Sequence, residues 1–300
     1  MKNSSAARQL SVVEHPKIAV RRATPADAEV CGRICYDAFT GIATAHNFPP
    51  DFPAPEVAVQ LLSHLFSHPG IYCVVAEEDE RVLGSNCLDE RSTISGVGPI
   101  TIAPDVQNKA VGKRLMQAVI DRSEEAGFPG IRLVQAGYHM RSLTLYAKLG
   151  FLVREHLACM QGPPIQKVPH GYSVRAAQMS DLTACNELCF RVHGVERAGE
   201  VKEAIEQGTA VVAEQDGELR AYSSNVAFFG HSVGETTRDL QALISAAKEF
   251  QGPGILVPTR NPELFRWCLE NGLRATQSLT LMTMGLYNEP AGAYLPSILY

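Results

Sequence analysis

Residues 100–115 read Ile100-Thr101-Ile102-Ala103-Pro104-Asp105-Val106-Gln107-Asn108-Lys109-Ala110-Val111-Gly112-Lys113-Arg114-Leu115. The order is an apolar strand, a proline that stops it, a tight loop and the start of an amphipathic helix. Free backbone N–H groups at a helix N-terminus attract phosphate, and Lys109, Lys113 and Arg114 add positive charge there. Because glycine has no Cβ, Gly112 is expected to let an anion approach the backbone closely. This stretch therefore predicts an anion site.

Alternating and helical patterns extend on both sides of this stretch. They predict strands at 18–22, 72–77, 81–89, 97–102, 131–135 and 152–160, and helices at 26–39, 56–67, 112–126 and 141–149. A meander of strands is followed by strands that alternate with helices. This order predicts an α/β fold with a mixed sheet that is covered by helices on both faces.

The chain also contains an internal repeat, which bears on the number of domains. A pattern in the first half, Val20-Arg21-x-Ala23-x-x-x-Asp27-x-x-x-Cys31-x-x-x-Cys35, recurs as Val174-Arg175-x-Ala177-x-x-x-Asp181-x-x-x-Cys185-x-x-x-Cys189. The sequence Val-Val-Ala-Glu occurs at 74–77 and again at 211–214. We therefore expect two tandem domains, at 16–160 and 172–300, joined by a Pro- and Gly-rich linker at 161–171.

Composition excludes several classes of partner. The formal net charge is -5, and no run of Lys and Arg is longer than two residues, which argues against nucleic acid or an anionic membrane as a partner. Residues 1–15 lack the apolar stretch of a signal peptide, and no apolar run is long enough to span a membrane. We expect a soluble, cytoplasmic protein.

The eight cysteines do not indicate disulfides, because we expect a reducing compartment. Cys31 and Cys35 are four apart on a predicted helix, as are Cys185 and Cys189, so each pair lies on one helix face. No further His or Cys completes a set of four ligands, and cysteine is among the residues most often buried. We expect core residues and no metal site.

Two segments resemble the GCN5-related N-acetyltransferase (GNAT) family. Residues 100–115 resemble its motif A, in which Gln/Arg-x-x-Gly-x-Gly/Ala follows an apolar-x-apolar-x-Pro strand, except that Ala110 stands where the first glycine is usual. Alanine suits that place if its φ is negative. The second family landmark, Asn-x-x-(Ala/Ser)-x-x-Leu-Tyr-x-Lys-x-Gly-Phe, is matched by residues 139–151, with His139 at the Asn position.

The resemblance implies two tandem GNAT-like acyl-CoA N-acyltransferase domains and acetyl-CoA as the co-substrate. It places acetyl-CoA in a splay between the strands at 97–102 and 131–135, with its pantetheine arm paired to the backbone of Ile100 and Ile102. The pyrophosphate is expected on the loop formed by Gln107, Asn108, Lys109, Ala110, Val111, Gly112 and Lys113.

The resemblance also suggests catalytic and acceptor residues. Tyr146 is expected to protonate the departing thiolate, although an aromatic anchor on the helix is the alternative. Asp89, Glu90 and His139 are candidate bases near strand ends, where solvated acids and helix caps are also common. The segment 41–55 is too rich in proline to be helical, and either it is a surface loop or it lines the acceptor pocket with Phe48, Asp51 and Phe52.

The second repeat reads as a degenerate copy. Its equivalent of the anion loop, residues 231–236, has no basic residue, and Cys268 stands in the place of Tyr146. The C-terminal run 287–300 is apolar for a chain end. We expect it to dock on the sheet, on the other domain or on another subunit, so a homodimer through the second domain or this tail is one expectation.

The leading hypothesis is an N-acetyltransferase that transfers an acetyl group to a primary amine of a small molecule by direct attack. One alternative is an acyl-CoA-binding sensor with little turnover. Another is a protein Nα-acetyltransferase, in which the segment 41–55 receives an extended chain.

Overall fold

The computed structural model describes residues 18–107 and 110–299. The first copy of the repeat contains β1 (Ala19–Arg22), η1 (Pro25–Asp27), α1 (Ala28–Ala45), α2 (Pro55–Ser67), β2 (Ile71–Glu78), β3 (Arg81–Asp89), β4 (Ser95–Val97), β5 (Thr101–Ile102), η2 (Pro104–Val106), α3 (Val111–Glu125), β6 (Gly130–Ala136), α4 (Met140–Lys148) and β7 (Leu152–Gln161). The second copy contains β8 (Tyr172–Ala176), η3 (Met179–Asp181), α5 (Leu182–His193), α6 (Ala198–Glu206), β9 (Val211–Gln215), β10 (Glu218–Ser223), β11 (Ser232–Gly234), α7 (Thr237–Ala246), β12 (Ile255–Pro258), α8 (Pro262–Glu270) and β13 (Arg274–Gly285). A short strand, β14 (Ala293–Leu295), follows at the end.

The repeat seen in the sequence recurs as the same set of contacts. Arg21 on β1 pairs with Asp27 at 2.8 Å and with Glu77 on β2 at 2.9 Å. At the equivalent place, Arg175 on β8 pairs with Asp181 at 2.7 Å and with Glu214 on β9 at 2.5 Å. In both copies the hydrogen bonds from the arginine lower the pKa of the aspartate below its usual range. Each ion pair fixes the start of a first helix against the first two strands.

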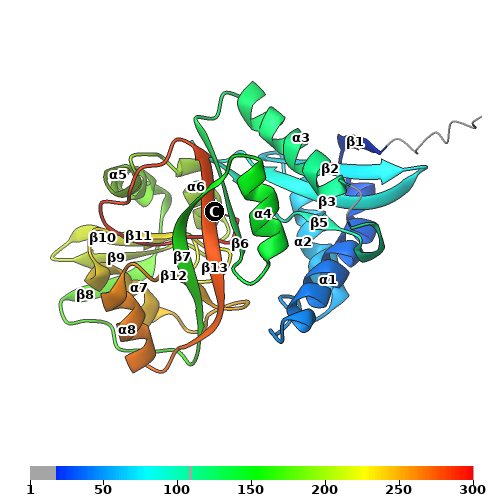
Figure 1. Ribbon diagram of the computed structural model, residues 1–300. Coiled ribbons are helices and arrows are strands. Elements are labelled where there is room, and N and C mark those ends of the chain that lie inside the picture. Colours follow the sequence, from blue (N-terminus) through cyan, green and yellow to red (C-terminus); the bar gives the residue numbers. More distant parts are fainter. Residues whose placement is uncertain (1–17, 108–109, 300) are drawn as a thin grey trace, which may run out of the picture.

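Two sheets hold the chain together, and the last strands of the two copies are exchanged. The larger sheet has the order β1-β2-β3-β4-β6-β13-β7-β12, with β5 paired to β3, and the smaller has the order β14-β11-β10-β9-β8. Strand β13 of the second copy lies between β6 and β7, while β7 of the first copy pairs with β12. Figure 1 shows β7 and β13 side by side between the two bodies. Each copy is therefore completed by a strand of the other.

Helices cover both faces of the first copy's sheet (Figure 1). Alternate residues of β2 serve the two faces, as the period of two in a strand requires. Val74 and Ala76 pack with α3, whereas Cys73 and Val75 pack with α1 and α2. The mixed α/β architecture expected from the element order is confirmed.

Two local expectations need correction. The strand expected at 97–102 is two short strands, because β4 ends at Val97 and β5 begins at Thr101. Part of the segment 41–55 is helical after all, since α1 continues to Ala45. Its first proline is Pro49, so proline does not interrupt the helix before that point.

All eight cysteines are free and buried, and Cys31 and Cys35 lie in the core beneath α1. In the described ranges, no group of three or more His, Cys, Asp or Glu side chains is placed to hold a metal ion. No helix among the described residues has both the length and the apolar character to cross a bilayer. The division into domains at 16–160 and 172–300 stays a proposal, and the exchanged strands tie the two together.

Candidate functional site

A splay opens in the sheet of the first copy between β5 and the end of β6. Strand β4 runs parallel to β6 and pairs with it as far as Val97 and Leu133. The chain then leaves β6, and β5 pairs with β3 instead. A Cβ on Gly84 of β3 would lie 2.2 Å from the Thr101 carbonyl oxygen, so a glycine at this position permits the close approach of β5. This switch of partner separates β5 from β6.

A cavity of about 400 Å³ begins in the splay and extends toward the second copy. Its walls include both arms of the splay, Gly98–Ile102 and Leu133–Ala136. Helix α4 contributes His139, Ser142, Leu145 and Tyr146, and the segment around α1 contributes Phe39, Asp51 and Phe52. The second copy and the chain end contribute Phe228, Phe229, Gln277, Leu279, Ile298 and Leu299. Both copies thus enclose this cavity.

The N-terminus of α3 lies at one end of the splay, and no described side chain caps it. Its N-cap residue Ala110 has φ 63° and ψ 9°, the left-handed conformation that costs a non-glycine residue about 1 kcal/mol. Alanine is expected to suit this place only with a negative φ, and that condition is not met. The first backbone N–H groups of α3 remain available to an anion.

The neighbours of Gly112 give it a role different from the expected one. A Cβ at this position would lie 3.0 Å from Ile102 Cδ1 and 3.5 Å from Leu145 Cδ2. Glycine therefore allows α3 to pack closely against β5, since a larger residue would push the Ile102 side chain aside by a few tenths of an ångström. Of the other loop residues, Gln107 lines the cavity and accepts a hydrogen bond of 3.0 Å from Arg141, and Lys113 is exposed. Asn108 and Lys109 lie outside the described residues.

The equivalent helix of the second copy, α7, has a different N-terminus. The Thr236 hydroxyl accepts a hydrogen bond from the backbone N–H of Asp239, and the Asp239 carboxylate accepts one of 2.7 Å from the backbone N–H of Thr236. Asp239 is fully buried, so a carboxylate already lies where an anion would bind. This reciprocal capping box satisfies the helix end with the chain's own groups.

Tyr146 is linked to His139 through one hydroxyl. The Tyr146 hydroxyl is hydrogen-bonded to the Ser142 side chain, and Ser142 Oγ lies 2.7 Å from His139 Nδ1. Burial raises the pKa of Tyr146 to about 12, so the phenol stays protonated at neutral pH. Burial, together with the nearby charge of Arg141, lowers the pKa of His139 and keeps the imidazole neutral. The three side chains form one hydrogen-bonded chain along the cavity.

Asp51 lines the same cavity. Gln277 of β13 donates a hydrogen bond of 3.4 Å to its carboxylate, and burial raises the pKa of Asp51 above its usual range. Phe52 is buried against Phe39, with ring centroids 5.8 Å apart. Phe48 does not itself line the cavity. Its ring stacks on that of Tyr138, with centroids 4.3 Å apart, and Tyr138 is one of the lining residues.

Glu90, an expected base, lies elsewhere. Its carboxylate is bound by Arg122 at 2.6 Å, and Glu90 is absent from the described residues that line the cavity. The neighbouring Asp89 is likewise held by Arg91 at 2.5 Å. Glu90 therefore joins the end of β3 to α3, and Asp89 holds the side chain of Arg91. Both carboxylates are engaged in ion pairs, so neither is placed to act as a base.

Two polar side chains on the arms of the splay lack partners within the part of the chain that the structure describes. These groups are the Thr101 hydroxyl on β5 and the Gln135 amide on β6, and their residues are 3% and 6% exposed. Leaving such a group unsatisfied costs about 1–3 kcal/mol. A ligand with amide groups in the splay would relieve this cost.

Sequence reasoning missed Ser142, Gln135, Gln277 and the apolar wall from the second copy. The family landmark accepts serine at position 142, but only the helix geometry shows that it bridges two side chains. Gln277 and Phe229 come from a different repeat, and no local pattern predicts that they face this cavity.

Residues 39–151 match the family model of the acetyltransferase (GNAT) family. No curated protein matches the chain by sequence. Solved structures are similar over nearly the whole chain. A structure assigned to an acetyltransferase from Pyrococcus horikoshii has a TM-score of 0.69 and 17% identity, covering 97% of this chain and 98% of its own.

A GCN5-related N-acetyltransferase from Sphaerobacter thermophilus has a TM-score of 0.58 and 15% identity, covering 91% of this chain and 96% of its own. A tandem GNAT protein from the clavulanic acid biosynthesis pathway has a TM-score of 0.55 and 14% identity, covering 90% and 98%. At these identities the likeness concerns the fold. It confirms the expectation of two tandem GNAT-like copies.

Proposed function

We propose that this chain, which carries the GNAT family domain at residues 39–151, is an N-acetyltransferase with one active site, formed in its first copy. It transfers the acetyl group of acetyl-CoA to a primary amine. The observation that carries the proposal is the continuous path from the uncapped N-terminus of α3, through the splay, to the side chains of Tyr146, Ser142 and His139.

The residues present fit acetyl-CoA. Its pyrophosphate binds the free N–H groups at the start of α3, with Lys113 and the loop from Gln107 nearby. The pantetheine arm pairs with the backbone of Ile100 and Ile102, and its amides reach the unsatisfied groups of Thr101 and Gln135. The second copy takes no acyl-CoA, because Asp239 occupies the helix end and repels phosphate.

The acceptor reaches the site as an ammonium with a pKa of about 10.4 and must lose a proton before it attacks. Asp51 takes this first proton. Its carboxylate lines the acceptor side of the cavity, and burial moves its pKa toward that of an effective base. The proton then passes to solvent.

The second proton moves from nitrogen to sulfur as the C–N bond forms and the C–S bond breaks. The phenol of Tyr146 has a pKa of about 12, and a thiol has a pKa of about 8.5. Transfer of the proton from this phenol to the thiolate therefore costs roughly 5 kcal/mol of free energy. Tyrosinate must therefore be reprotonated in the same step. His139 Nε2 accepts the amine proton, Nδ1–H donates to Ser142, Ser142 donates to Tyr146, and Tyr146 donates to sulfur.

Calorimetry and a thiol-release assay over a panel of amines test this function. We expect one CoA bound per chain and thiol release with at least one small primary amine. Lys113→Glu at the start of α3 is expected to weaken CoA binding by roughly tenfold or more, since a charge-assisted contact is worth about 1.5–3 kcal/mol. The matched change at the start of α7, Arg238→Glu, is expected to have no effect.

Three outcomes oppose the proposal. Tight CoA binding with no turnover on any amine favours an acyl-CoA sensor. Turnover only on peptides with a free N-terminus favours a protein Nα-acetyltransferase. Two CoA molecules per chain would contradict the assignment of a single site.

A further inference from the structure

The C-terminal segment, residues 293–299, fills a place in the second copy that is open in the first. In the first copy β4 pairs with β6 and then diverges from it to form the splay. The equivalent strands of the second copy, β11 and β12, do not pair with each other. Instead β14 pairs antiparallel with β11, from Ser232↔Leu295 to Gly234↔Ala293, and also contacts β12.

This segment is built into the fold. Ala293, Tyr294 and Leu295 are each at most 5% exposed, and a Cβ on Gly292 would lie 2.6 Å from the Gly234 carbonyl oxygen. Ala293 and Leu295 belong to the same core as helices α7 and α8. The segment therefore docks within its own chain.

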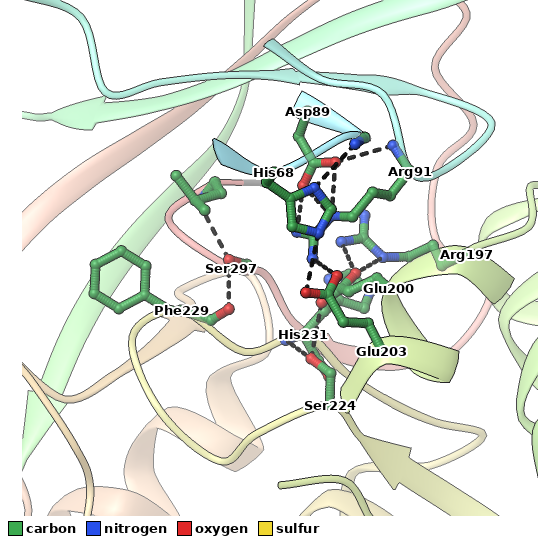
Figure 2. Close-up of polar contacts among 12 residues, drawn as sticks. His68, Asp89, Arg91, Arg197, Glu200, Glu203, Ser224, Phe229, His231 and Ser297 are labelled. Atoms are coloured by element: carbon green, nitrogen blue, oxygen red, sulfur yellow. Dashed lines mark hydrogen bonds and ion pairs between the residues drawn. The ribbon is translucent and has the colours of Figure 1, made fainter. Parts of the chain in front are cut away.

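Beyond β14 the segment is fastened to the loop that follows β10. The Ser297 hydroxyl donates a hydrogen bond of 3.0 Å to the Phe229 carbonyl, and the Ile298 N–H donates one of 2.9 Å to the Phe228 carbonyl. Ser297 Oγ also accepts a bond of 3.1 Å from the Leu299 N–H. Figure 2 shows Ser297 bonded to Phe229 in this way. Loop and segment are therefore held as one unit.

Helix α6, whose Glu200 accepts a hydrogen bond of 2.8 Å from Ser224 at the start of this loop, is joined to the first copy by ion pairs. Arg91, after β3, binds Asp89 and reaches Glu203 of α6 at 2.5 Å, while His68 lies 3.1 Å from Glu203 (Figure 2). Burial would raise the pKa of Glu203, but the hydrogen bonds and charge of Arg91 lower it below its usual value. The carboxylate therefore stays charged at neutral pH, and the ion pair with Arg91 is retained.

The C-terminal segment and the loop after β10 together form an apolar wall of the cavity. Phe228, Phe229, Ile298 and Leu299 all line it, and Leu299 packs against the core formed by α1 and α2. Phe229 is 43% exposed, so part of its ring is accessible to a ligand. Asp51 and its partner Gln277 line the same cavity, so a carboxylate and an apolar surface share one space.

We propose that the C-terminal segment of the second copy occupies, in that copy, the position that acyl-CoA takes in the first copy. The segment thereby places Ile298 and Leu299 beside Phe229, and these three side chains form the wall that selects the acceptor. The acceptor is a primary amine attached to an apolar alkyl or aryl group. This inference rests on the proposed function for its donor, and it adds the class of acceptor. A diamine or a sugar amine would leave polar groups unpaired against the wall.

A series of primary amines tests the inference: ethylamine, butylamine, hexylamine, phenethylamine and 1,4-diaminobutane. For the wild type, kcat/KM is expected to rise by up to about fourfold per added methylene, and hexylamine is expected to exceed the diamine strongly. Phe229→Ser and Leu299→Ser are expected to lower the hexylamine-to-ethylamine ratio by roughly tenfold. Neither should change the KM for acetyl-CoA. Phe190→Ser, at an exposed phenylalanine of α5 outside the cavity, is the matched control and is expected to leave the ratio unchanged.

Binding of the same amines to the CoA-saturated protein, measured by calorimetry, separates the two proposals. Turnover that is indifferent to chain length, or a ratio that Phe229→Ser and Leu299→Ser leave unchanged, would overturn the inference and leave the acetyltransferase intact. Affinity that rises with chain length without any turnover would support the apolar wall and contradict the proposed function. If Leu299→Ser does not fold, Phe229→Ser alone decides, because that side chain is already half exposed.

Discussion

Replacing Tyr146 with phenylalanine is expected to lower kcat by roughly 10²- to 10⁴-fold, the usual contribution of a positioned proton donor. The KM for acetyl-CoA should change little, because the hydroxyl acts on the sulfur only as it departs. The ring itself packs against Phe151 in the core, with centroids 6.3 Å apart, and phenylalanine preserves that contact. Steady-state thiol release measures the effect.

Two companion variants identify the path of the proton. Ser142→Ala interrupts the link between Tyr146 and His139 while the phenol remains, and a loss smaller than that of Tyr146→Phe is expected. Tyr287→Phe removes a hydroxyl whose pKa is also raised to about 12 but which lies outside the described cavity lining, and should retain full activity. Full activity in Tyr146→Phe would exclude the acid role and leave Tyr146 as an aromatic anchor.

The second large effect is expected for Asp51→Asn, with a loss in kcat/KM of roughly 10²-fold or more at neutral pH. Asparagine keeps the shape and the contact with Gln277 but cannot take the proton of the ammonium. Activity of the wild type should fall as the pH drops through the raised pKa of Asp51, and the variant should lose that limb of the profile. Equal activity of Asp51→Asn and wild type on small amines would refute the base role.

The stability of the same variant should change in the opposite direction. Burial raises the folded-state pKa of Asp51, so between its unfolded and folded pKa values the folded protein binds the extra proton. The free energy of unfolding therefore declines as pH rises through that window, and the charged carboxylate is a cost above it. Asp51→Asn removes this cost, so thermal unfolding at neutral pH should show a protein at least as stable as the wild type. Such a trade of stability for activity is typical of a functional site.

Much of the fold was predictable because the signals are local. The spacing of Arg21 and Asp27 recurs at Arg175 and Asp181, and both pairs form the same ion pair in the structure. Strand and helix limits in the first copy agree within a few residues, apart from the break after Val97 and the end of α1, which extends beyond the expected 39 to Ala45. That break depends on Gly84, which lies on another strand, and no pattern within 97–102 indicates it.

The features that sequence could not predict are pairings between distant segments. The period of two in β7 and β13 predicts strands but does not say which strand lies beside which. The apolar chain end predicted docking, yet three partners fitted equally well until β14 was seen on β11. Glu90 illustrates the converse: an acid at a strand end looks available in the sequence, and only the position of Arg122 shows that it is engaged.

Ala110 remains the main departure from the family pattern. It holds the left-handed conformation for which glycine is preferred, directly before the helix end that is proposed to bind pyrophosphate. Strain retained at such a position is common where backbone groups must point at a ligand. The backbone geometry at the start of α3 is therefore kept despite the alanine.

Hydrogen exchange with and without CoA reports which of the two helix ends binds the co-substrate. We expect slower exchange at β5 and at the start of α3, residues 101–102 and 111–114, with no change at residues 232–239. Protection at the start of α7 instead, or at both helix ends, would contradict the assignment of one acyl-CoA site to the first copy.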